Sequence, residues 1–520
     1  MSGKCRKIMY ALVVTVFAAF LWMICCENDR KVSDKAIGET TVQSMRSGEK
    51  TVSLEQSDIP KIEIEDLTDA FTVILQYAPK DMLAGCTVDE SFLMWFYAQY
   101  GRDAVIHIAF DVLDGGNDPD VWYEETGNSI HVLWLLYCRD SGFGQHELEN
   151  VYWMQTAAAS EMVFGFAGDI NFAENWYTTE YMKEQPDGLW DCFSEDLLAQ
   201  MQGVDVMIMN NEFTYVNKKG ATSVYGKAYT FRADPQKAEL LEIFGTDTVT
   251  LANNHVYDYE KRGLLSTLDV LDQEGIPYSG AGRNLKDASK IIYYVMNGRK
   301  VAFVSATQIE RSKQYTKAAT ETEPGVLKAL HPEKFLKIVK EAAQNSDYVI
   351  AEVHWGTEGM LYPDQSQRHL AEQIAQAGAD VIIGGHPHRL QGTTFVGDVP
   401  IAYSLGNFWF STGTLYTTLA KVTITEDGTV KLSFVPCIQQ NLTTRILTEP
   451  EEQSDFYEYL ASVSMDIGID ADGVVYNKNA DDYPAGEILY DSDTSQTDII
   501  GMADNEGDAI DIVGNLREDR

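Results

Sequence analysis

The sequence predicts an α/β fold, with a layered domain over residues 161–440 behind a small, mostly helical domain at 61–150. From Glu161 onward, short apolar runs rich in β-branched residues alternate with stretches of helical periodicity, which is the pattern of sheets covered by helices. Hydrophobic residues make up 45% of the chain and charged residues 23%, as is typical of a globular protein with a sizeable core.

The first residues, 1–26, predict a membrane anchor. A basic start precedes an uncharged run, Ile8–Cys26, that is long enough to span a bilayer as a helix. The positive-inside rule keeps the basic start in the cytoplasm, so we expect a single-pass protein of the cell membrane with its main domain extracellular. A cleaved signal peptide and a lipoprotein signal at Cys25 or Cys26 are the alternatives.

Three further segments lie outside the helical domain and the α/β region. Residues 27–60 are polar and lack an apolar period, so they are expected to form a flexible linker. Residues 441–477 form a C-terminal extension, and the acidic, Gly/Asp/Asn-rich stretch 478–520 is expected to be a disordered tail. In the helical domain, 61–150, no group stands out as a candidate for chemistry.

The composition argues against nucleic acid as a partner. The formal net charge is −39, from 79 acidic and 40 basic residues, whereas phosphate backbones are bound by Lys and Arg. A small anionic substrate remains compatible with this negative charge, because a bound divalent metal makes the local electrostatic potential positive. The seven Cys contain no CxxC pair and indicate neither a disulfide scaffold nor a Cys-based zinc site, although one Cys86–Cys138 bridge stays open.

Helices and strands alternate through the α/β region. A strong turn signal at Asn297-Gly298 predicts a hairpin of its two flanking strands. Helices are expected at Leu197–Met201, Pro235–Phe244, Tyr259–Glu274, His331–Asn345, Gln365–Ala377 and Glu449–Leu460. Strands are expected at Met162–Ala167, Val204–Met209, the run from Thr248, Ile291–Met296, Val301–Ala306, Tyr348–Val353, Asp380–Ile383, Gly392–Val396, Pro400–Ser404, Leu419–Thr425 and Val430–Val435.

Five of the predicted strands end in side chains that can bind metal. Open α/β sheets place their ligands at strand ends, and oxygen and imidazole donors are those that Mn, Fe or Zn accept. Each motif alone also fits a turn or a packed core residue, but five together favour a site. The ends are Gly168-Asp169, Asn210-Asn211-Glu212, Asn254-His255, His354-Trp355-Gly356 and Gly384-Gly385-His386-Pro387-His388.

The order Asp, Glu, Asn-His, His, His-x-His resembles that of the calcineurin-like metallophosphoesterases. More closely, the chain over about residues 162–440 resembles the capsule-synthesis CapA family, associated with poly-γ-glutamate. The stretches that carry this resemblance are Phe166-Ala-Gly-Asp169, Asn211-Glu212, Tyr229-Thr-Phe-Arg-Ala-Asp-Pro235, Leu251-Ala-Asn-Asn-His255 with Asp258, His354-Trp-Gly356, Gly385-His-Pro-His388 and Ser404-Leu-Gly-Asn-Phe408.

The resemblance implies a metallophosphoesterase-like sandwich that holds two divalent ions of Mn, Fe or Zn. The implied ligands are Asp169, Glu212, Asn254, His354, His386 and His388, with Glu212 bridging the ions. It further implies that His255 protonates the leaving oxygen. Asp258, about a helical turn after His255, is expected to orient it. Arg232 is expected to bind a substrate anion or to form a structural ion pair. One departure is Asn171, where many relatives have His, so a mononuclear or silent site stays open.

The resulting functional expectation is an extracytoplasmic protein of capsule, poly-γ-glutamate or other surface-polymer biosynthesis. We expect a metal-dependent phosphoesterase acting on an anionic surface polymer or a phosphate ester. The alternatives are a hydrolase or transferase of an amide-linked glutamyl polymer, and a non-catalytic assembly subunit on the same fold. Other capsule-synthesis membrane proteins are candidate partners.

Overall fold

The computed structural model describes residues 67–78, 83, 86–114, 119–219, 221–308, 315–484 and 486–492. The predicted anchor at 1–26 and linker at 27–60 lie outside these residues. Within the described part of the chain, no helix is long and apolar enough to cross a membrane.

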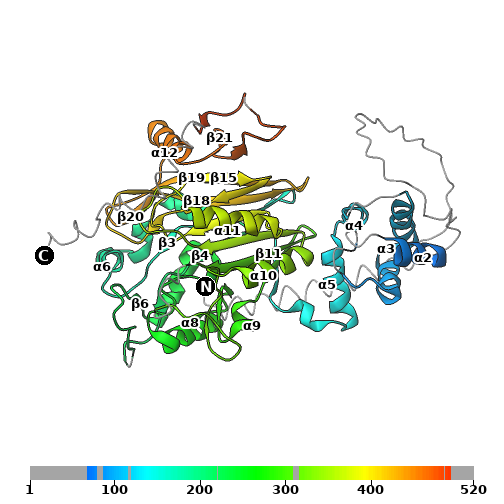
Figure 1. Cartoon of the computed structure of the whole chain (residues 1–520), viewed down its shortest axis with the longest axis horizontal. Helices are drawn as coiled ribbons and strands as arrows, with labels where there is room; N and C mark the ends of the chain where they lie inside the picture. The colour runs from blue at the N-terminus through cyan, green and yellow to red at the C-terminus, as the bar shows by residue number, and fades with distance from the viewer. Residues whose placement is uncertain are drawn as a thin grey trace. The chain divides into compact units, whose positions relative to one another are not determined.

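Two seven-stranded sheets form the centre of the structure (Figure 1). The first has the order β20 (Thr443–Ile446), β19 (Val430–Gln440), β18 (Leu415–Thr425), β2 (Glu161–Ala167), β4 (Val206–Asn210), β7 (Thr246–Thr250) and β8 (Tyr278–Ser279). The second has the order β1 (Val151–Trp153), β10 (Ile292–Met296), β11 (Arg299–Thr307), β13 (Tyr348–His354), β14 (Val381–Gly385), β16 (Val399–Ala402) and β15 (Thr393–Val396).

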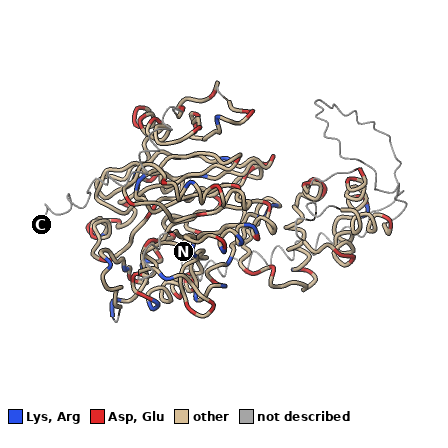
Figure 2. The backbone as a smooth tube through the Cα atoms, in the orientation of Figure 1, with Lys and Arg blue, Asp and Glu red and all other residues tan. Residues whose placement is uncertain are grey.

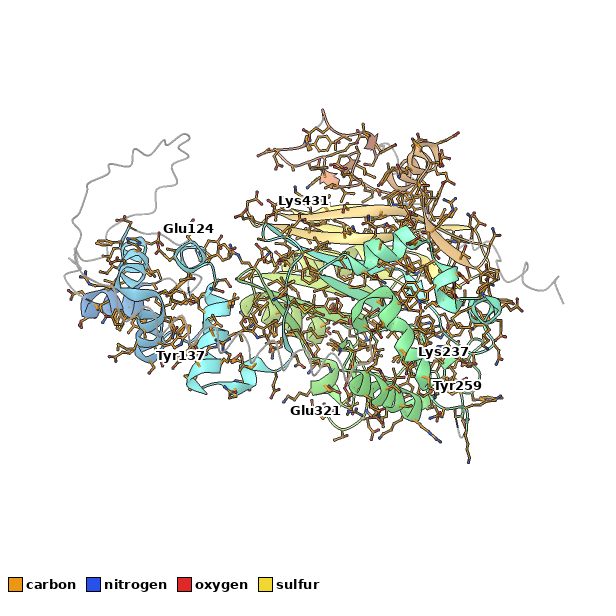
Figure 3. The ribbon with its side chains drawn as sticks, turned by 180° about the vertical axis from the view of Figure 1, so that it is seen from behind. Glu124, Tyr137, Lys237, Tyr259, Glu321 and Lys431 are labelled. Carbon is orange, nitrogen blue, oxygen red and sulfur yellow. The ribbon has the colours of Figure 1, made fainter. Side chains whose placement is uncertain are left out.

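The two sheets pack face to face. One hydrophobic cluster joins residues of both, and the rings of Phe166 on β2 and Phe303 on β11 lie 6.2 Å apart between them. Helices cover the outer faces: α7 (Glu195–Gln202), the 3₁₀ helix η4 (Pro235–Phe244) and α8 (Glu260–Glu274) on one, α10 (Glu333–Gln344) and α11 (Gln365–Gln376) on the other. Side chains fill the space between these layers (Figure 3). The predicted layered α/β architecture is therefore confirmed at the level of mixed sheets covered by helices.

Parallel pairing determines where the strands end. β2, β4 and β7 run parallel in the first sheet, and β11, β13 and β14 run parallel in the second. The carboxyl ends of parallel neighbours meet at one edge of a sheet. Polar residues that follow these strands are thus brought together although they are far apart in the sequence.

The predicted hairpin of β10 and β11 is confirmed, with antiparallel pairing from Ile292–Phe303 to Met296–Arg299. Asn297 and Gly298 have φ angles of 47° and 69°, the left-handed values that a tight hairpin turn requires. The Gly298 carbonyl accepts a hydrogen bond from the Ser129 amide at the start of α5 (Ile130–Ser141).

The N-terminal helices, α2 (Leu67–Tyr77), α3 (Glu90–Leu113), α4 (Val121–Thr126) and α5, share a hydrophobic core of their own. α3 bends at Gly101, whose φ is 87°. Val132 and Leu135 of α5 pack against Val295 of β10, which joins the helices to the second sheet. Cys86 and Cys138 are free thiols, so the bridge that the sequence left open is not formed.

Beyond the sheets, α12 (Pro450–Ser462) precedes β21 (Ile467–Ile469), β22 (Val475–Asn477) and β23 (Tyr490–Asp491). The sequence predicted a disordered tail from residue 478, but β23 pairs with β21 through Gly468–Asp491 and Ile469–Tyr490. That boundary is wrong for the described residues up to Ser492. The remainder of the predicted tail lies outside the described residues.

Acidic and basic residues are interspersed over the described elements (Figure 2).

We predict that Gly298→Ala destabilises the protein by more than about 3 kcal/mol, because the new Cβ would lie 1.8 Å from the Gly127 carbonyl oxygen. Gly397→Ala is the matched control. Gly397 also has a left-handed φ, 60°, but its Cβ would meet nothing within 4 Å, so only about 1 kcal/mol is expected. Urea unfolding measures both, and equal losses would contradict the packing described here.

Candidate metal centre

Polar residues from both sheets meet at one place. From the first sheet come Asp169, in the short strand β3 (Asp169–Ile170) after β2, Glu212 after β4, and Asn254 after β7. From the second come His354, the last residue of β13, and the His386-Pro387-His388 turn after β14. All six predicted ligands are thus placed at the carboxyl ends of parallel strands.

Two groups of donors share Glu212. One comprises Glu212, His354 and His386, the other Asp169, Glu212 and His388, and within each group the donor atoms lie within 4.8 Å of one another. A carboxylate common to two such groups is suited to bridge two metal ions.

The first group converges on the Nε2 atom of His354. This nitrogen lies 2.8 Å from Asn254 Oδ1, 3.1 Å from His386 Nδ1 and 3.4 Å from Glu212 Oε1. Asn254 therefore joins the group with its amide. Ring nitrogens and oxygens facing one another at these distances need a proton or a cation among them.

The buried carboxylates give a physical test of whether a metal fits. Glu212 is 0% exposed, and neither of its oxygens has a hydrogen-bond partner among the described residues. Burial, with the nearby charge of Asp169, raises the pKa of Glu212 well above its usual value. A buried unpaired carboxylate costs several kcal/mol, and a divalent cation offsets this cost. Three imidazoles, two carboxylates and one amide are a donor set suited to Mn, Fe or Zn.

Asp169 and His388 in the second group form an ion pair. His388 Nδ1 lies 3.0 Å from Asp169 Oδ2. Although burial opposes the charged form, the hydrogen bond to Asp169 raises the pKa of His388 to about 9. The same bond holds the pKa of Asp169 below its usual value despite its burial. The first group differs, because burial lowers the pKa of His354 to about 3 and keeps that imidazole neutral.

Three asparagines hold the ligands in place. Asn210 Nδ2 donates to Asp169 Oδ1 at 2.7 Å, and Asn253 Nδ2 donates to Asn210 Oδ1 at 3.0 Å. Asn407, in β17 (Asn407–Trp409), has its Oδ1 2.8 Å from His388 Nδ1. The sequence assigned no role to these residues, although Asn407 lies in the Ser404–Phe408 motif that supported the resemblance.

His255 lies beside the ligands and is oriented by Asp258. His255 Nδ1 is 2.7 Å from Asp258 Oδ2, and Asp258 is 0% exposed. Lys227 Nζ contacts Asp258 Oδ1 at 2.5 Å and donates to the Asn254 carbonyl at 2.7 Å. Lys227 therefore ties the ligand residue to the residue that orients His255. Nothing in the sequence around it marked Lys227 for this role.

Two further residues of the sequence analysis have structural partners. Arg232, in β6 (Arg232–Ala233), donates from Nη1 to the Val216 carbonyl at 3.0 Å, so its predicted role with a substrate anion stays a prediction. Asn171 accepts a hydrogen bond from the Ala173 amide at its Oδ1. The oxygen of Asn171 thus shapes a turn, in keeping with the departure noted in the sequence.

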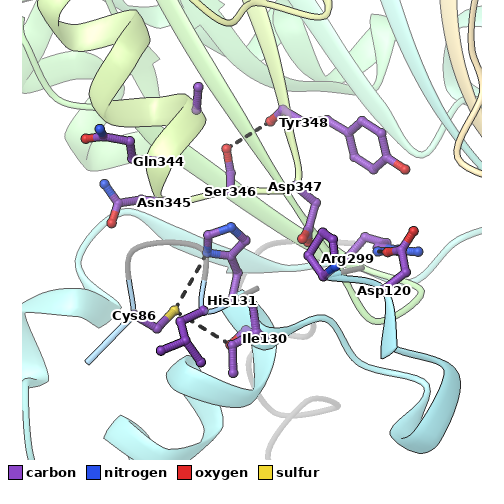
Figure 4. Close-up of a pocket in the computed structure, with 13 residues that line it drawn as sticks. Cys86, Asp120, Ile130, His131, Arg299, Gln344, Asn345, Ser346, Asp347 and Tyr348 are labelled. Carbon is purple, nitrogen blue, oxygen red and sulfur yellow. Dashed lines mark hydrogen bonds and ion pairs between the residues drawn. The ribbon is translucent and has the colours of Figure 1, made fainter. Parts of the chain in front are cut away.

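A pocket of about 900 Å³ lies elsewhere, among residues of α5, of the β10–β11 turn region and of the segment that leads into β13 (Figure 4). Cys86 and His131 face each other there with Sγ and Nδ1 3.9 Å apart. Burial raises the pKa of Cys86 to about 12 and lowers that of His131 to about 3. Both groups stay neutral, so this pair lacks the thiolate that nucleophilic chemistry needs.

Comparison with known proteins bears on the same region. Residues 163–412 match the family described as bacterial capsule synthesis protein PGA_cap. Over this segment the chain resembles the CapA family of capsule-synthesis proteins. It is 34% identical over 223 residues to the capsule biosynthesis protein CapA of Bacillus anthracis, covering 42% of this chain and 53% of that protein. It is 34% identical over 214 residues to the PGA biosynthesis protein CapA of Bacillus subtilis, covering 40% and 55%.

The chain spans about half the length of these curated relatives. Among solved structures, a novel phosphatase from Mycoplasma pneumoniae aligns with 58% of this chain and 99% of its own, at 12% identity and a TM-score of 0.34. This likeness is too distant to bear on function. The family-matched segment contains all the predicted ligands, and their roles remain predictions.

In the metal-free protein we predict that stability falls as pH rises from 6.5 to 9. A pKa raised to about 9 for His388 means that its ion pair with Asp169 contributes fully below pH 6.5 and is lost as pH passes 9. The expected loss is roughly 2–3 kcal/mol. Urea unfolding of chelator-treated protein at several pH values measures it. His388→Gln serves as control and flattens the dependence, whereas a wild type flat over this range would disprove the pairing.

Proposed function

We propose that this CapA-like protein is a metal-dependent hydrolase of phosphate esters that acts in the synthesis of capsule, poly-γ-glutamate or another surface polymer. The observation that carries the proposal is the buried, unpartnered Glu212 carboxylate shared by two donor groups. We further propose that the N-terminal segment anchors the protein in the cell membrane with this domain outside.

The residues of the centre divide into those that bind metal and those that act on substrate. Asp169, Glu212 and His388 would hold one divalent ion, and Glu212, Asn254, His354 and His386 the other. The chemistry that such ions supply is charge stabilisation on the phosphoryl oxygens and a lowered pKa of the attacking water. The asparagines behind Asp169 and His388 keep these ligands in fixed orientations, as metal sites require.

His255 is the proposed proton donor to the leaving oxygen. Its Nδ1 bonds to the Asp258 carboxylate, which leaves Nε2 for the substrate. Burial lowers the pKa of His255 to about 4, so in the resting protein Nε2 carries no proton. The negative charge of a bound phosphate favours the imidazolium form and raises this pKa. Donation by His255 thus follows substrate binding, with Asp258 stabilising the charged ring.

An assembly subunit without turnover is the second candidate. The observation that favours it is the ion pair of His388 with Asp169, because it pairs two of the three members of the second donor group with each other. Asn171, with its oxygen bonded to the Ala173 amide, adds no imidazole to that group. A protein of this kind would hold one ion and bind polymer or other capsule-synthesis membrane proteins. Cleavage of an amide-linked glutamyl polymer is a third outcome of the same experiment.

We predict that the full chain binds Mn, Fe or Zn and hydrolyses a chromogenic phosphate ester, and that His386→Ala loses both. Metal analysis and assays with p-nitrophenyl phosphate and its diester test this. His369→Ala is the matched control, because His369 is 69% exposed on α11 and lies outside both donor groups. Bound metal without turnover of either ester would favour the subunit or the amide hydrolase, and absence of metal would reject the site.

We also predict that Asp258→Asn lowers kcat by roughly 10²-fold while metal content stays unchanged. An asparagine amide no longer stabilises the charged imidazole or fixes its tautomer, yet it leaves the ligands in place. Steady-state kinetics beside metal analysis separates the two effects. Unchanged kcat would remove His255 from the reaction.

A further inference from the structure

The His386-Pro387-His388 turn has a strained backbone. His386 has a φ of 101° and His388 a φ of 56°, in the left-handed region that residues with side chains avoid. Such conformations cost on the order of 1–3 kcal/mol each and persist only where the surroundings enforce them. Because each histidine belongs to a different donor group, the shape of this turn sets the spacing of the whole centre.

Some of the contacts that hold the His386-Pro387-His388 turn are made by residues within the family-matched segment, 163–412. The Pro387 carbonyl accepts a hydrogen bond from the Gly359 amide at 2.8 Å. Leu390, two residues after His388, pairs with Leu405 in an isolated bridge. These contacts hold the two sides of the turn but leave the Leu390 carbonyl to another partner.

That partner comes from outside residues 163–412. The Tyr459 hydroxyl, on α12, donates to the Leu390 carbonyl at 2.7 Å. The contact continues along the chain, because Ser464 Oγ accepts from the Thr393 amide at 2.8 Å and the Met465 amide donates to the Thr393 carbonyl at 3.0 Å. We call the segment Tyr459–Met465 the C-terminal clasp. In Figure 1, α12 lies next to β15, the strand that begins at Thr393.

The clasp is closely packed against the residues after the turn. A Cβ on Gly392 would lie 1.9 Å from the Val463 carbonyl oxygen, so only glycine allows this approach. The Tyr459 ring packs on Tyr416 with centroids 5.3 Å apart. Burial raises the pKa of Tyr459 to about 12, so its hydroxyl remains a donor throughout the physiological range. The residues after the turn are therefore held at two points, Leu390 by Tyr459 and Thr393 by Ser464 and Met465.

We propose that the C-terminal clasp holds the strained His386-Pro387-His388 turn in its metal-binding shape, with Tyr459 as the positioning residue. This inference rests on the metal centre of the proposed function. Without the Tyr459 hydroxyl, the Leu390 carbonyl loses its partner and the turn relaxes toward unstrained φ values. The two imidazoles then leave the positions that bring them to Glu212.

The test compares Tyr459→Phe with Tyr457→Phe. Tyr457 is on the same helix, and its hydroxyl also donates to a backbone carbonyl, that of Phe434 in β19, at 3.0 Å. Both variants lose one hydrogen bond, so the metal-free proteins should show similar melting temperatures. Mn²⁺ affinity, measured on the full chain by competition with a chelating indicator, should fall roughly tenfold in Tyr459→Phe alone.

Ser464→Ala gives a second, milder disruption of the clasp and should weaken Mn²⁺ binding several-fold. Equal Mn²⁺ affinity in the wild type, Tyr459→Phe and Ser464→Ala would overturn the inference while leaving the metal centre intact. A loss of the same size in Tyr457→Phe would also overturn it, since general destabilisation would then explain the effect. A wild type that binds no Mn²⁺ would reject the metal centre and the clasp together.

Discussion

The Glu212 carboxylate is fully buried among nitrogen and oxygen donors and has no hydrogen-bond partner among the described residues. In an interior of low dielectric such a charge is costly, and it is retained only where a cation or a proton balances it. Much of the surrounding architecture follows from this constraint. Two sheets pack so that their parallel strands end around one point, and each donor group that includes Glu212 contains residues from both sheets.

The candidate ligands are themselves held by residues outside the two donor groups. Asn210 and Asn407 fix Asp169 and His388, and Lys227 joins the Asn254 carbonyl to Asp258. The clasp extends this support to the His386–His388 turn from beyond the family-matched segment. Part of the support for the candidate metal centre therefore comes from residues beyond the family-matched segment 163–412.

The sequence predicted the strands and indicated the candidate ligands because both leave local signals. An apolar run that ends in Asp169 or His354 can be read from its neighbours, and the parallel arrangement brings such ends together. The supporting residues could not be predicted in this way, since Lys227 and Tyr459 act through partners 31 and 69 residues away. The left-handed φ of His386 could not be predicted from the sequence. This conformation is usually indicated by a glycine, and the residue here is a histidine. The tail boundary was misplaced because the pairing of β23 with β21 outweighs an acidic composition.

Crystals of the full chain grown with Mn²⁺ and measured at the manganese absorption edge test the central claim most directly. The account predicts two anomalous peaks about 4 Å apart on either side of the Glu212 carboxylate. One would contact Asp169 and His388, the other His354 and His386. Absence of a peak at Glu212, or peaks only at other places in the protein, would contradict it.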